Sequence, residues 1–406
     1  MKKIAIISSC SLPIPAIKGG AVETLIENIV KENENLKKID LYIISIYDKE
    51  ASLQSNKYKY SKFVYFKKNW IIKQSDLVIT QILKKIKRDR TISSRNYLWK
   101  LLVLKKLSKH LRENNYDYII IENTVYLFNV LKNDYIREKY KDKYFFHVHN
   151  NLVKKGCKEV VLKCRKFIAI SNYIKENIVN VLGTDISDKV SILHNGINTD
   201  LFNRSLSCEE KTNLLNNLGI DDNKKILLFA GRITPEKGIK EVLQAFKKID
   251  REDLILLIIG SSYFGNGTSS EFENEVITLV NGMKEKIVFT GYINNEEIWK
   301  YYKLASVAVL PSMWDEPLGL TMIEAKCSGI PVITTNSGGI PETIKNGQGI
   351  ILKRDENIVE NIAKSIEQIL DNMDIWKEKI NEAKIEALME NSLENYYNGF
   401  INILMN

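Results

Sequence analysis

Short apolar runs of strand length recur along the whole chain, and they restrict its fold more than any other feature. The runs fall into two sets, KIAIIS, DLYIISI, YDYIIIEN, YFFHVHN, KFIAIS and VSILHN, and then KILLFAGR, LILLIIGS, KIVFTGY, SVAVLPS and PVITTNS. Strands buried on both faces of a parallel sheet have this nearly continuous apolar pattern. Helix-length stretches such as AVETLIENIVKENENL separate many of the runs. We therefore predict an α/β fold with doubly wound sheets.

The strand pattern breaks near the segment HNGINTDLF and then resumes, which divides the chain into two similar halves. A length of 406 residues is enough for two domains of ordinary size. We predict a first Rossmann-like domain over residues 1–195 and a second over residues 196–380. We expect residues 381–406 to form a C-terminal helix that packs back on the first domain.

Several features favour a cytoplasmic protein. No apolar run approaches the ~20 residues that a membrane-spanning helix needs. The opening segment MKKIAIISSC has a shorter apolar run than a signal peptide, so we interpret it as a first strand. The cysteines are dispersed and odd in number, which favours reduced thiols: Cys10, Cys157, Cys164, Cys208 and Cys327.

Two loops that follow predicted strands carry groups suited to phosphate, and ligands of doubly wound sheets bind at such loops. Gly19 and Gly20 precede a helix that should start near Ala21, so the backbone there could approach an anion closely. An ordinary flexible loop fits these glycines equally well. In GRITPEKGI, Arg232 and Lys237 could hold a diphosphate between them. The plainer alternative is a solvated loop charge beside a lysine at a helix start.

The segment WDEPLGLTMIEA places one acid in a loop, Glu316, and another in the helix expected after it, Glu324. The first turn of that helix would offer unpaired backbone N–H groups at Gly319, Leu320 and Thr321. An acid on each side of an anion site suits a nucleotide sugar, because carboxylates accept paired hydrogen bonds from vicinal hydroxyls. The alternative is that each acid only favours the helix N-terminus electrostatically.

Two histidines alternate in the strand FFHVHNN, so His147 and His149 should point to one face. Metal binding has thin support, because no acid or cysteine lies nearby in the sequence. One histidine that reaches a substrate, or a pair packed in the core, fits as well. No Asp-x-Asp pair occurs in the chain, so we expect neither a dedicated metal site nor a cofactor.

Together these motifs resemble the retaining GT-B glycosyltransferases of the family 4 type. FAGRITPEKGI is similar to the family's strand–Arg–x4–Lys-Gly element, and EPLGLTMIEA followed by SGIPVITTNSGGIPE is similar to its E-x7-E region. ILHNGINTDLF resembles the family's interdomain crossover, and GGAVE resembles its N-terminal glycine loop. The matches are ordered along nearly the whole chain, from Gly19 to Glu342. The resemblance implies two Rossmann-like domains that face a central cleft.

The resemblance also implies a nucleotide-diphosphate-sugar donor, with UDP preferred and GDP second. Arg232 and Lys237 would bind the diphosphate, Glu324 the ribose hydroxyls and Glu316 the hexose hydroxyls. His149 matches the family's histidine that approaches the transferred sugar, and His147 is the less favoured choice. The remaining donor contacts implied are Gly20 near the diphosphate, backbone at Gly319, Leu320 and Thr321 near the phosphates or sugar, and Tyr292 and Ile293 beside the base. Glu23 is not carried over, because two residues rather than one separate it from the glycine pair.

The family is thought to retain anomeric configuration by attack on the same face of the sugar through an oxocarbenium-like state. Glu316 need not be a nucleophile in this mechanism, since the departing diphosphate can accept the acceptor's proton. Arg232, Lys237 and the helix N-terminus would stabilise the leaving group without a metal. A non-catalytic GT-B nucleotide-binding subunit and a GT-B sugar-nucleotide epimerase are the alternatives, and the intact motifs favour transfer.

Positive charge is concentrated in one segment, which has 17 Lys and Arg residues between Lys57 and Arg112 and only two acids, Asp76 and Asp89. An anionic membrane surface or a pyrophosphate-linked lipid acceptor would suit this excess. Nucleic acid is the rival partner, but no recognisable binding motif supports it. A solvated lysine-rich surface is the plainer alternative. We expect a cytoplasmic enzyme that works at the inner face of the membrane on a glycan or lipid-linked acceptor.

Overall fold

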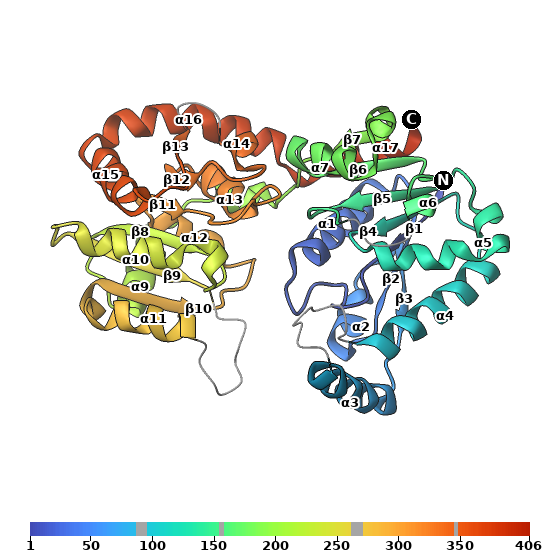
Figure 1. Ribbon diagram of the computed structural model, residues 1–406. Coiled ribbons are helices and arrows are strands. Elements are labelled where there is room, and N and C mark those ends of the chain that lie inside the picture. The colour runs from blue at the N-terminus through green and yellow to red at the C-terminus, as the bar shows by residue number, and fades with distance from the viewer. Residues whose placement is uncertain (87–95, 154–157, 261–270, 345–347) are drawn as a thin grey trace. The chain divides into compact units, whose positions relative to one another are not determined.

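The structure is a computed structural model that describes residues 1–86, 96–153, 158–260, 271–344 and 348–406. The chain forms two compact units (Figure 1). Unit 1 consists of Met1–Gly196 together with Tyr396–Asn406, and unit 2 consists of Ile197–Asn395. Each unit is a parallel sheet with helices against both faces. The predicted α/β fold with doubly wound sheets is therefore confirmed.

The sheet of unit 1 has seven parallel strands in the order β3-β2-β1-β4-β5-β6-β7. The strand order changes direction between β1 and β4, and doubly wound sheets bind ligands beyond the strand ends at such a point. The strands are β1 (Lys3–Ile7), β2 (Asp40–Ile46), β3 (Ser61–Phe66), β4 (Tyr118–Glu122), β5 (Tyr144–Val148), β6 (Lys166–Ala169) and β7 (Val190–Ile192). The predicted glycine loop follows the carboxyl end of β1, and the two predicted histidines lie at the carboxyl end of β5.

Amphipathic helices cover this sheet. The helix α1 (Ala21–Leu36) buries Leu25, Ile26, Ile29 and Val30 in the core, which is the spacing expected for one helical face. The other helices of unit 1 before its C-terminal segment are α2 (Lys49–Ser55), α3 (Trp70–Ile86), α4 (Tyr97–Glu113), α5 (Asp134–Lys139), α6 (Lys158–Val161) and α7 (Asn172–Leu182), with 3-10 turns η2 (Val125–Lys132) and η3 (Thr184–Lys189).

The last helix, α17 (Leu393–Met405), completes the core of unit 1. Tyr397 and Phe400 are fully buried there, and the Tyr397 hydroxyl donates to Asn33 Oδ1 at 2.6 Å. The preceding helix, α16 (Met373–Glu390), packs in unit 2, because Trp376 and Ile380 belong to that unit's core. The chain therefore rejoins unit 1 at residue 396, later than the boundary at 380 predicted from the sequence.

The sheet of unit 2 has six parallel strands in the order β10-β9-β8-β11-β12-β13. The strands are β8 (Lys225–Ala230), β9 (Leu254–Ile259), β10 (Ile287–Gly291), β11 (Val307–Leu310), β12 (Val332–Thr335) and β13 (Gly349–Leu352). The order again changes direction beside the first strand of the unit, between β8 and β11. The loops after these two strands hold Arg232, Lys237 and Glu316, and Glu324 lies in the helix that follows the second loop, so the topology brings these residues to one edge of one sheet.

The helices of unit 2 follow the same packing logic. In α10 (Ile239–Lys248), Ile239, Val242, Leu243 and Phe246 have i, i+3, i+4, i+7 spacing and are all buried. The others are α8 (Thr199–Asn203), α9 (Cys208–Leu218), α11 (Glu271–Asn281), α12 (Ile298–Leu304), α13 (Leu320–Ser328), α14 (Ile340–Thr343) and α15 (Ile358–Asp371), with 3-10 turns η4 (Pro235–Lys237) and η5 (Lys284–Lys286). None of the helices in the described part of the chain has both the length and the apolar character to cross a membrane.

Candidate functional site

The loop after β8 places the two predicted cations of unit 2. Arg232 Nη2 lies 3.3 Å from Glu236 Oε1, so the guanidinium is held beside a surface acid. Lys237 ends the short turn η4, and Gly238 then adopts a φ of 71° before α10 begins. A Cβ on Gly238 would lie 2.1 Å from the backbone oxygen of Pro311. Glycine therefore allows the cation loop to pack directly against the loop that follows β11.

The carboxylate of Glu316 is the meeting point of three donors in unit 2. Its Oε2 accepts from Lys237 Nζ at 2.7 Å, from Trp314 Nε1 at 2.9 Å and from Ser312 Oγ at 3.2 Å. The structure thus joins two predicted site residues in one ion pair. Ser312 and Trp314 were not predicted, although both stand within four residues of Glu316. Because the donors converge on one oxygen, Oε1 of Glu316 is the oxygen left for a ligand.

The N-terminus of α13 lies directly after Glu316. Gly319 caps the helix with a φ of 90°, and Leu320 and Thr321 form its first turn, where backbone N–H groups lack partners within the helix. Gly338 packs against the same loop, and a Cβ there would lie 2.3 Å from the backbone oxygen of Glu316. The glycine-rich loop after β12 therefore fixes the backbone that carries the acid, beside a helix end suited to an anion.

The second glutamate, Glu324, is held from a different helix. The hydroxyl of Tyr302, which is buried in α12, donates to Glu324 Oε2 at 2.8 Å. Burial raises the pKa of the Glu324 carboxyl to about 7, and the tyrosine hydroxyl opposes this rise only in part. Tyr302 was not predicted, because in the sequence it cannot be distinguished from an ordinary core aromatic residue. Glu324 and Glu316 lie on different elements and have different hydrogen-bond partners.

The raised pKa of Glu324 gives a pH dependence of stability with a definite sign. Its pKa rises from an ordinary value of 4.5 to about 7 in the folded protein, so between these values the folded state keeps a proton that the unfolded state has lost. The contribution to stability is complete below about pH 4.5 and is lost as the pH rises through about 7. We expect the difference in unfolding free energy between the protein and its Glu324→Gln variant to fall over this range in urea titrations. A difference that does not change with pH would contradict the assignment.

The residues predicted to contact the base and the diphosphate lie on two other loops. Tyr292 directly follows β10 and has 65% of its side chain exposed, while Ile293 beside it is half-buried. Gly20 caps α1 in unit 1 with a φ of 105°, and a Cβ there would lie 2.3 Å from Glu23 Oε2. Glu23 is itself buried, and burial raises the pKa of its carboxyl. The positive φ, which residues with a Cβ rarely adopt, favours glycine at position 20.

In unit 1 the carboxyl ends of β4 and β5 bring together a buried acid and both predicted histidines. Glu122 Oε2 lies 2.8 Å from His149 Nε2, and Glu122 Oε1 lies 3.3 Å from His147 Nδ1. The neighbouring Asn123 holds the exit of β5, because its Oδ1 accepts from the backbone N–H groups of His149 and Asn150 at 3.0 and 3.2 Å. Glu122 was not predicted as a site residue, although an acid that ends the apolar run YIIIE is a usable signal.

The three buried side chains differ in charge at neutral pH. Burial alone would raise the pKa of the Glu122 carboxyl, but the two histidines beside it lower the pKa to about 2. Burial, and then the charge of His147, lower the pKa of His149 to about 4 against the opposing effect of Glu122. Glu122 is therefore ionised and His149 neutral at pH 7.

The same three residues also form a possible metal-binding set, because their ligand atoms lie within 4.8 Å of one another. Two histidines and one carboxylate bind transition metals in many proteins. A metal-bound histidine usually donates its other ring N–H to an acceptor. Within the described part of the chain, however, His147 Nε2 and His149 Nδ1 are buried and have no hydrogen-bond partner. The acceptor that usually supports a metal-bound histidine is therefore missing at both rings among the described residues.

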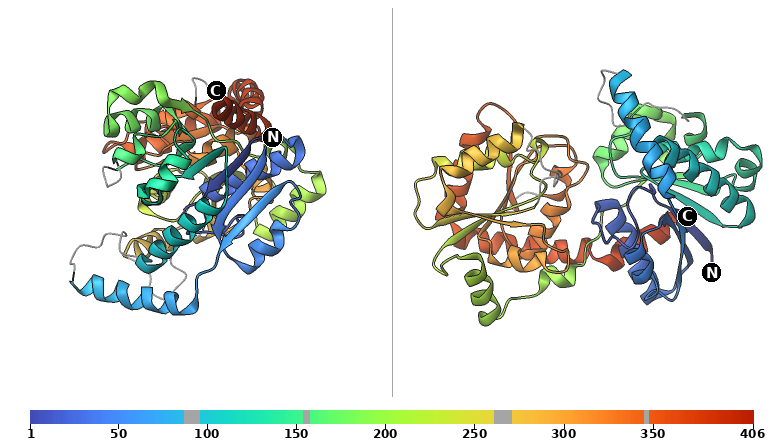
Figure 2. Two further views of the ribbon diagram at one scale, coloured as in Figure 1. Left: turned by 90° about the vertical axis from the view of Figure 1, so that its right-hand side faces the viewer. Right: turned by 90° about the horizontal axis from the view of Figure 1, so that it is seen from below.

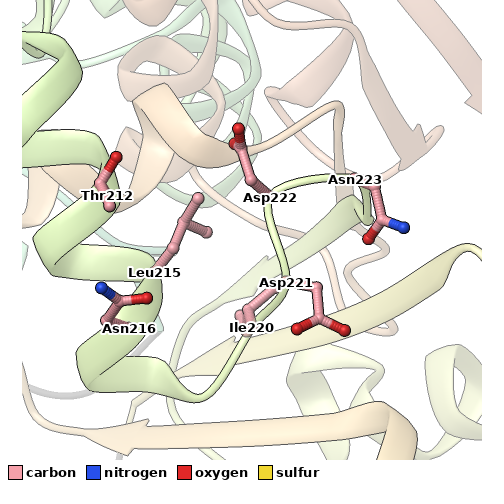
Figure 3. A pocket seen from close by; sticks show the side chains of 7 residues that line it. All are labelled: Thr212, Leu215, Asn216, Ile220, Asp221, Asp222 and Asn223. Atoms are coloured by element: carbon pink, nitrogen blue, oxygen red, sulfur yellow. The ribbon is translucent and has the colours of Figure 1, made fainter.

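A separate pocket of about 290 Å³ lies between α9 and the turn before β8. Figure 3 shows its lining side chains, which come from Thr212, Leu215 and Asn216 of α9 and from residues 220–223. This pocket adjoins the amino end of β8, whereas ligands of doubly wound sheets bind at the carboxyl ends. We therefore place the functional site at the strand-end loops and not in this pocket.

Two protein-family models match adjacent parts of the chain. Residues 210–386 match the model described as "Glycosyl transferases group 1", and residues 57–201 match "Glycosyltransferase Family 4". The first match lies within unit 2, and the second lies on unit 1 apart from its end at residues 197–201.

Several curated relatives are glycosyltransferases by name. The chain is 24% identical to the putative glycosyltransferase YtcC of Bacillus subtilis, over 95% of this chain and 88% of the relative. It is 32% identical to the uncharacterized glycosyltransferase MJ1607 of Methanocaldococcus jannaschii, over 58% of each chain, so the match spans little more than half of that relative. It is 28% identical to a lipopolysaccharide 1,2-N-acetylglucosaminetransferase of Salmonella typhimurium, over 56% of this chain and 57% of the relative.

Solved structures share the fold over the full chain. A glycosyltransferase from Rickettsia africae matches with a TM-score of 0.75 at 21% identity and covers 99% of this chain and 98% of its own. Anabaena HepE in complex with UDP matches with a TM-score of 0.73 at 16% identity and covers 99% of both chains.

Proposed function

The chain belongs to the family 4 type of glycosyltransferases and has the GT-B fold, and from this premise we propose that it transfers a hexose-type sugar from a UDP-sugar to a glycan or lipid-linked acceptor. The observation that carries the proposal is the pair of acids in unit 2, each held by its own donors at the edge where ligands bind. HepE has been solved with UDP and with UDP-glucose, which supports UDP as the nucleotide here.

The ion pair of Lys237 with Glu316 suits a UDP-sugar, because one partner can bind the diphosphate and the other the sugar, on the two sides of the bond that breaks. The lysine ammonium has three N–H donors and uses one on Glu316 at 2.7 Å, which leaves others for diphosphate oxygens. Glu316 keeps Oε1 for a hexose hydroxyl, because Lys237, Trp314 and Ser312 all occupy Oε2. The pair thereby couples the position of the sugar to the position of the phosphate.

We propose that the leaving diphosphate is stabilised without a metal. Negative charge grows on the phosphate oxygen as the sugar departs, and fixed donors aimed at that oxygen lower the barrier. Lys237, Arg232 and the first turn of α13 supply such donors on adjacent loops of unit 2. The diphosphate then accepts the proton of the acceptor hydroxyl, and the configuration at the sugar is retained. For Gly20 and His149 in unit 1, the roles implied by the family resemblance stay predictions.

A calorimetric comparison of the two glutamates tests the proposal. If Glu324 holds the ribose, Glu324→Gln should weaken UDP binding by roughly 1.5–3 kcal/mol, the contribution of a hydrogen bond to a charged group. If Glu316 holds the hexose, Glu316→Gln should leave UDP affinity nearly unchanged and still reduce transfer. The isosteric variants keep the volume of each side chain, so each serves as the control for the other. An equal loss of UDP affinity in both would contradict the arrangement.

The products distinguish transfer from the two alternative functions. Incubation with UDP-glucose or UDP-N-acetylglucosamine, followed by separation of UDP, transferred sugar and epimerised donor, gives a different pattern for each function. Free UDP together with glycosylated acceptor supports transfer. An epimerised donor would support an epimerase, and bound but unchanged donor would support a non-catalytic subunit.

Activity should persist in excess EDTA, because the cations and the α13 N-terminus take the part that a divalent ion plays in metal-dependent transferases. Initial rates with and without chelator measure this, and rates in added manganese or magnesium are the control. Loss of transfer in EDTA that manganese or magnesium restores would refute metal independence.

We further propose that the enzyme works on an anionic membrane. Four apolar side chains are exposed on α3 at i, i+1, i+7 and i+8, and therefore share one helical face: Trp70, Ile71, Leu77 and Val78. Exposed lysines flank this face at Lys67 and Lys73. In Figure 2 the helix, in light blue, lies at the margin of unit 1. A helix with an apolar face and neighbouring cations lies in the surface of an anionic bilayer, which supports a lipid-linked or membrane-proximal acceptor.

A further inference from the structure

Trp314 of unit 2 lies in the same loop as Glu316 and binds its carboxylate. The indole Nε1–H donates at 2.9 Å to Glu316 Oε2, the oxygen that also accepts from Lys237 Nζ at 2.7 Å and from Ser312 Oγ at 3.2 Å. An indole N–H can only donate, and a hydrogen bond to an ionised acceptor is stronger than one between neutral groups. Only 13% of the Glu316 side chain is exposed, so these bonds are partly shielded from water.

The three donors to this oxygen differ in what else they can bind. The Lys237 ammonium is a mobile cation with three N–H groups, and a bound diphosphate would attract it away from Glu316. The Ser312 hydroxyl has a single proton, which it divides between Glu316 Oε2 at 3.2 Å and the backbone oxygen of Glu236 at 3.4 Å. The indole of Trp314 also has a single N–H, and this group is directed at Glu316. Trp314 is therefore the donor best suited to stay on the acid when the lysine binds phosphate.

The segment that carries the tryptophan is held at both ends by the strand and loop that follow it in the sheet. The hydroxyl of Thr335, the last residue of β12, donates to the backbone oxygen of Ser312 at 2.6 Å, and both residues are buried. The backbone N–H of Gly339 donates to the backbone oxygen of Glu316 at 2.7 Å. A side chain can hold a functional group accurately only when its own backbone is fixed, and these contacts meet that requirement.

We propose that Trp314 is a positioning residue that keeps the Glu316 carboxylate in place for the transferred sugar while Lys237 binds the diphosphate. Trp314 acts through Glu316 and does not itself contact the sugar. Because the indole holds Oε2, Oε1 remains the oxygen available to a sugar hydroxyl. The hydrogen bond between the tryptophan and the acid is independent of the proposed function, whereas its effect on transfer rests on that function.

Nitrogen-15 NMR of the indole N–H groups in the full chain tests the hydrogen bond. The chain has five tryptophans, so the Trp314 signal can be assigned with Trp314→Phe. A carboxylate is a stronger acceptor than an amide oxygen, and we therefore expect the indole proton signal to move upfield in Glu316→Gln. In Lys237→Ala the signal should stay downfield, because the bond does not need the lysine. The control Glu275→Gln changes an acid of a surface pair in the same unit and should not move it.

Two results of this measurement would overturn the proposal. One is an unchanged Trp314 signal in folded Glu316→Gln, and the other is loss of the downfield position in Lys237→Ala. If Glu316→Gln does not fold, the position of the signal in the unaltered protein and in Lys237→Ala decides.

Trp314→Phe tests the effect on transfer, because phenylalanine keeps an aromatic ring but has no N–H donor. With UDP-glucose or UDP-N-acetylglucosamine we expect kcat for UDP release to fall about tenfold, as for one lost hydrogen bond to a charged group, at unchanged UDP affinity. The control Trp376→Phe changes a tryptophan in the core of unit 2 and should leave kcat unchanged.

Full kcat in Trp314→Phe would overturn the positioning role, and so would a loss of UDP affinity in Trp314→Phe or an equal fall of kcat in Trp376→Phe. If the unaltered protein binds no UDP, or releases none from either donor, the proposed function fails. The effect on transfer then fails with it, while the hydrogen-bond result stands.

Discussion

Alanine in place of Lys237 should slow sugar transfer about 100- to 1000-fold, the range for losing one preorganised group that stabilises developing negative charge. The lysine ammonium lies 2.7 Å from Glu316, so its removal takes away a phosphate contact and also releases one of three donors that fix the acid. Arg232→Ala should slow transfer to a similar extent, because Arg232 lies in the same loop after β8 as Lys237. Steady-state kinetics with UDP-sugar and acceptor give both values.

A matched lysine in the same unit separates this effect from a general loss of charge. Lys240 Nζ on the surface of α10 lies 2.7 Å from Glu275 Oε2 of α11. Lys240→Ala therefore also breaks a Lys–Glu pair, but outside the strand-end loops. Its turnover should equal that of the unaltered enzyme. Urea unfolding of each variant checks that the fold is retained. Full turnover by Lys237→Ala or Arg232→Ala, with unchanged donor affinity, would defeat their assignment to the diphosphate.

Reversing three exposed lysines of the basic segment should release the protein from anionic vesicles. We expect Lys67→Glu, Lys73→Glu and Lys105→Glu together to cost at least about 3 kcal/mol of membrane binding, since each cation near an anionic surface contributes roughly 1 kcal/mol. Replacing Trp70 and Ile71 by serine should weaken binding separately, through the loss of apolar contact. Vesicle sedimentation over a salt series measures both, and binding should fall as salt rises because screening acts over roughly 8 Å at physiological ionic strength.

The control places the same charge change elsewhere on unit 1. Lys141, Lys143 and Lys189 are exposed and lie outside the basic segment, so their change to glutamate should leave vesicle binding far less affected. UDP binding should survive in both triple variants, because none of the six lysines is among the predicted donor residues. If the unaltered protein does not sediment with anionic vesicles even at low salt, the α3 face is not a membrane surface.

The strands that could be predicted from the sequence are those with strand-length apolar runs, and the exceptions lie at sheet edges. Each sheet contains one strand that was not among the predicted runs, β3 in unit 1 and β13 in unit 2. Both are terminal in their sheets, and both are only partly buried. An edge strand can leave one side in contact with solvent, so its sequence lacks the continuous apolar run that marks a central strand. The strand Gly349–Leu352 is also too short to show an alternation of apolar and polar residues.

The residue types of the candidate site could be predicted from local motifs, but their partners could not. Lys237 and Glu316 are 79 positions apart, and no local pattern indicates that they form a pair. Tyr302 supports Glu324 from another helix, and Glu122 meets His147 and His149 from a neighbouring strand. Such contacts depend on sheet order and on side-chain direction, which a linear sequence does not contain. The predicted boundary at residue 380 differs from the observed one for a related reason, because packing places α16 in the core of unit 2 and α17 in the core of unit 1.

The return of α17 to unit 1 has a consequence for how the protein is made. Domains of a growing chain usually fold in the order in which they leave the ribosome. All seven strands of the first sheet are synthesised by residue 192, yet Tyr397 and Phe400, which are fully buried in its core, are synthesised only after the whole of unit 2. The apolar surface that they cover therefore stays open to solvent or to chaperones while unit 2 is being synthesised. Unit 1, which begins first, can therefore finish folding only after unit 2 has been synthesised.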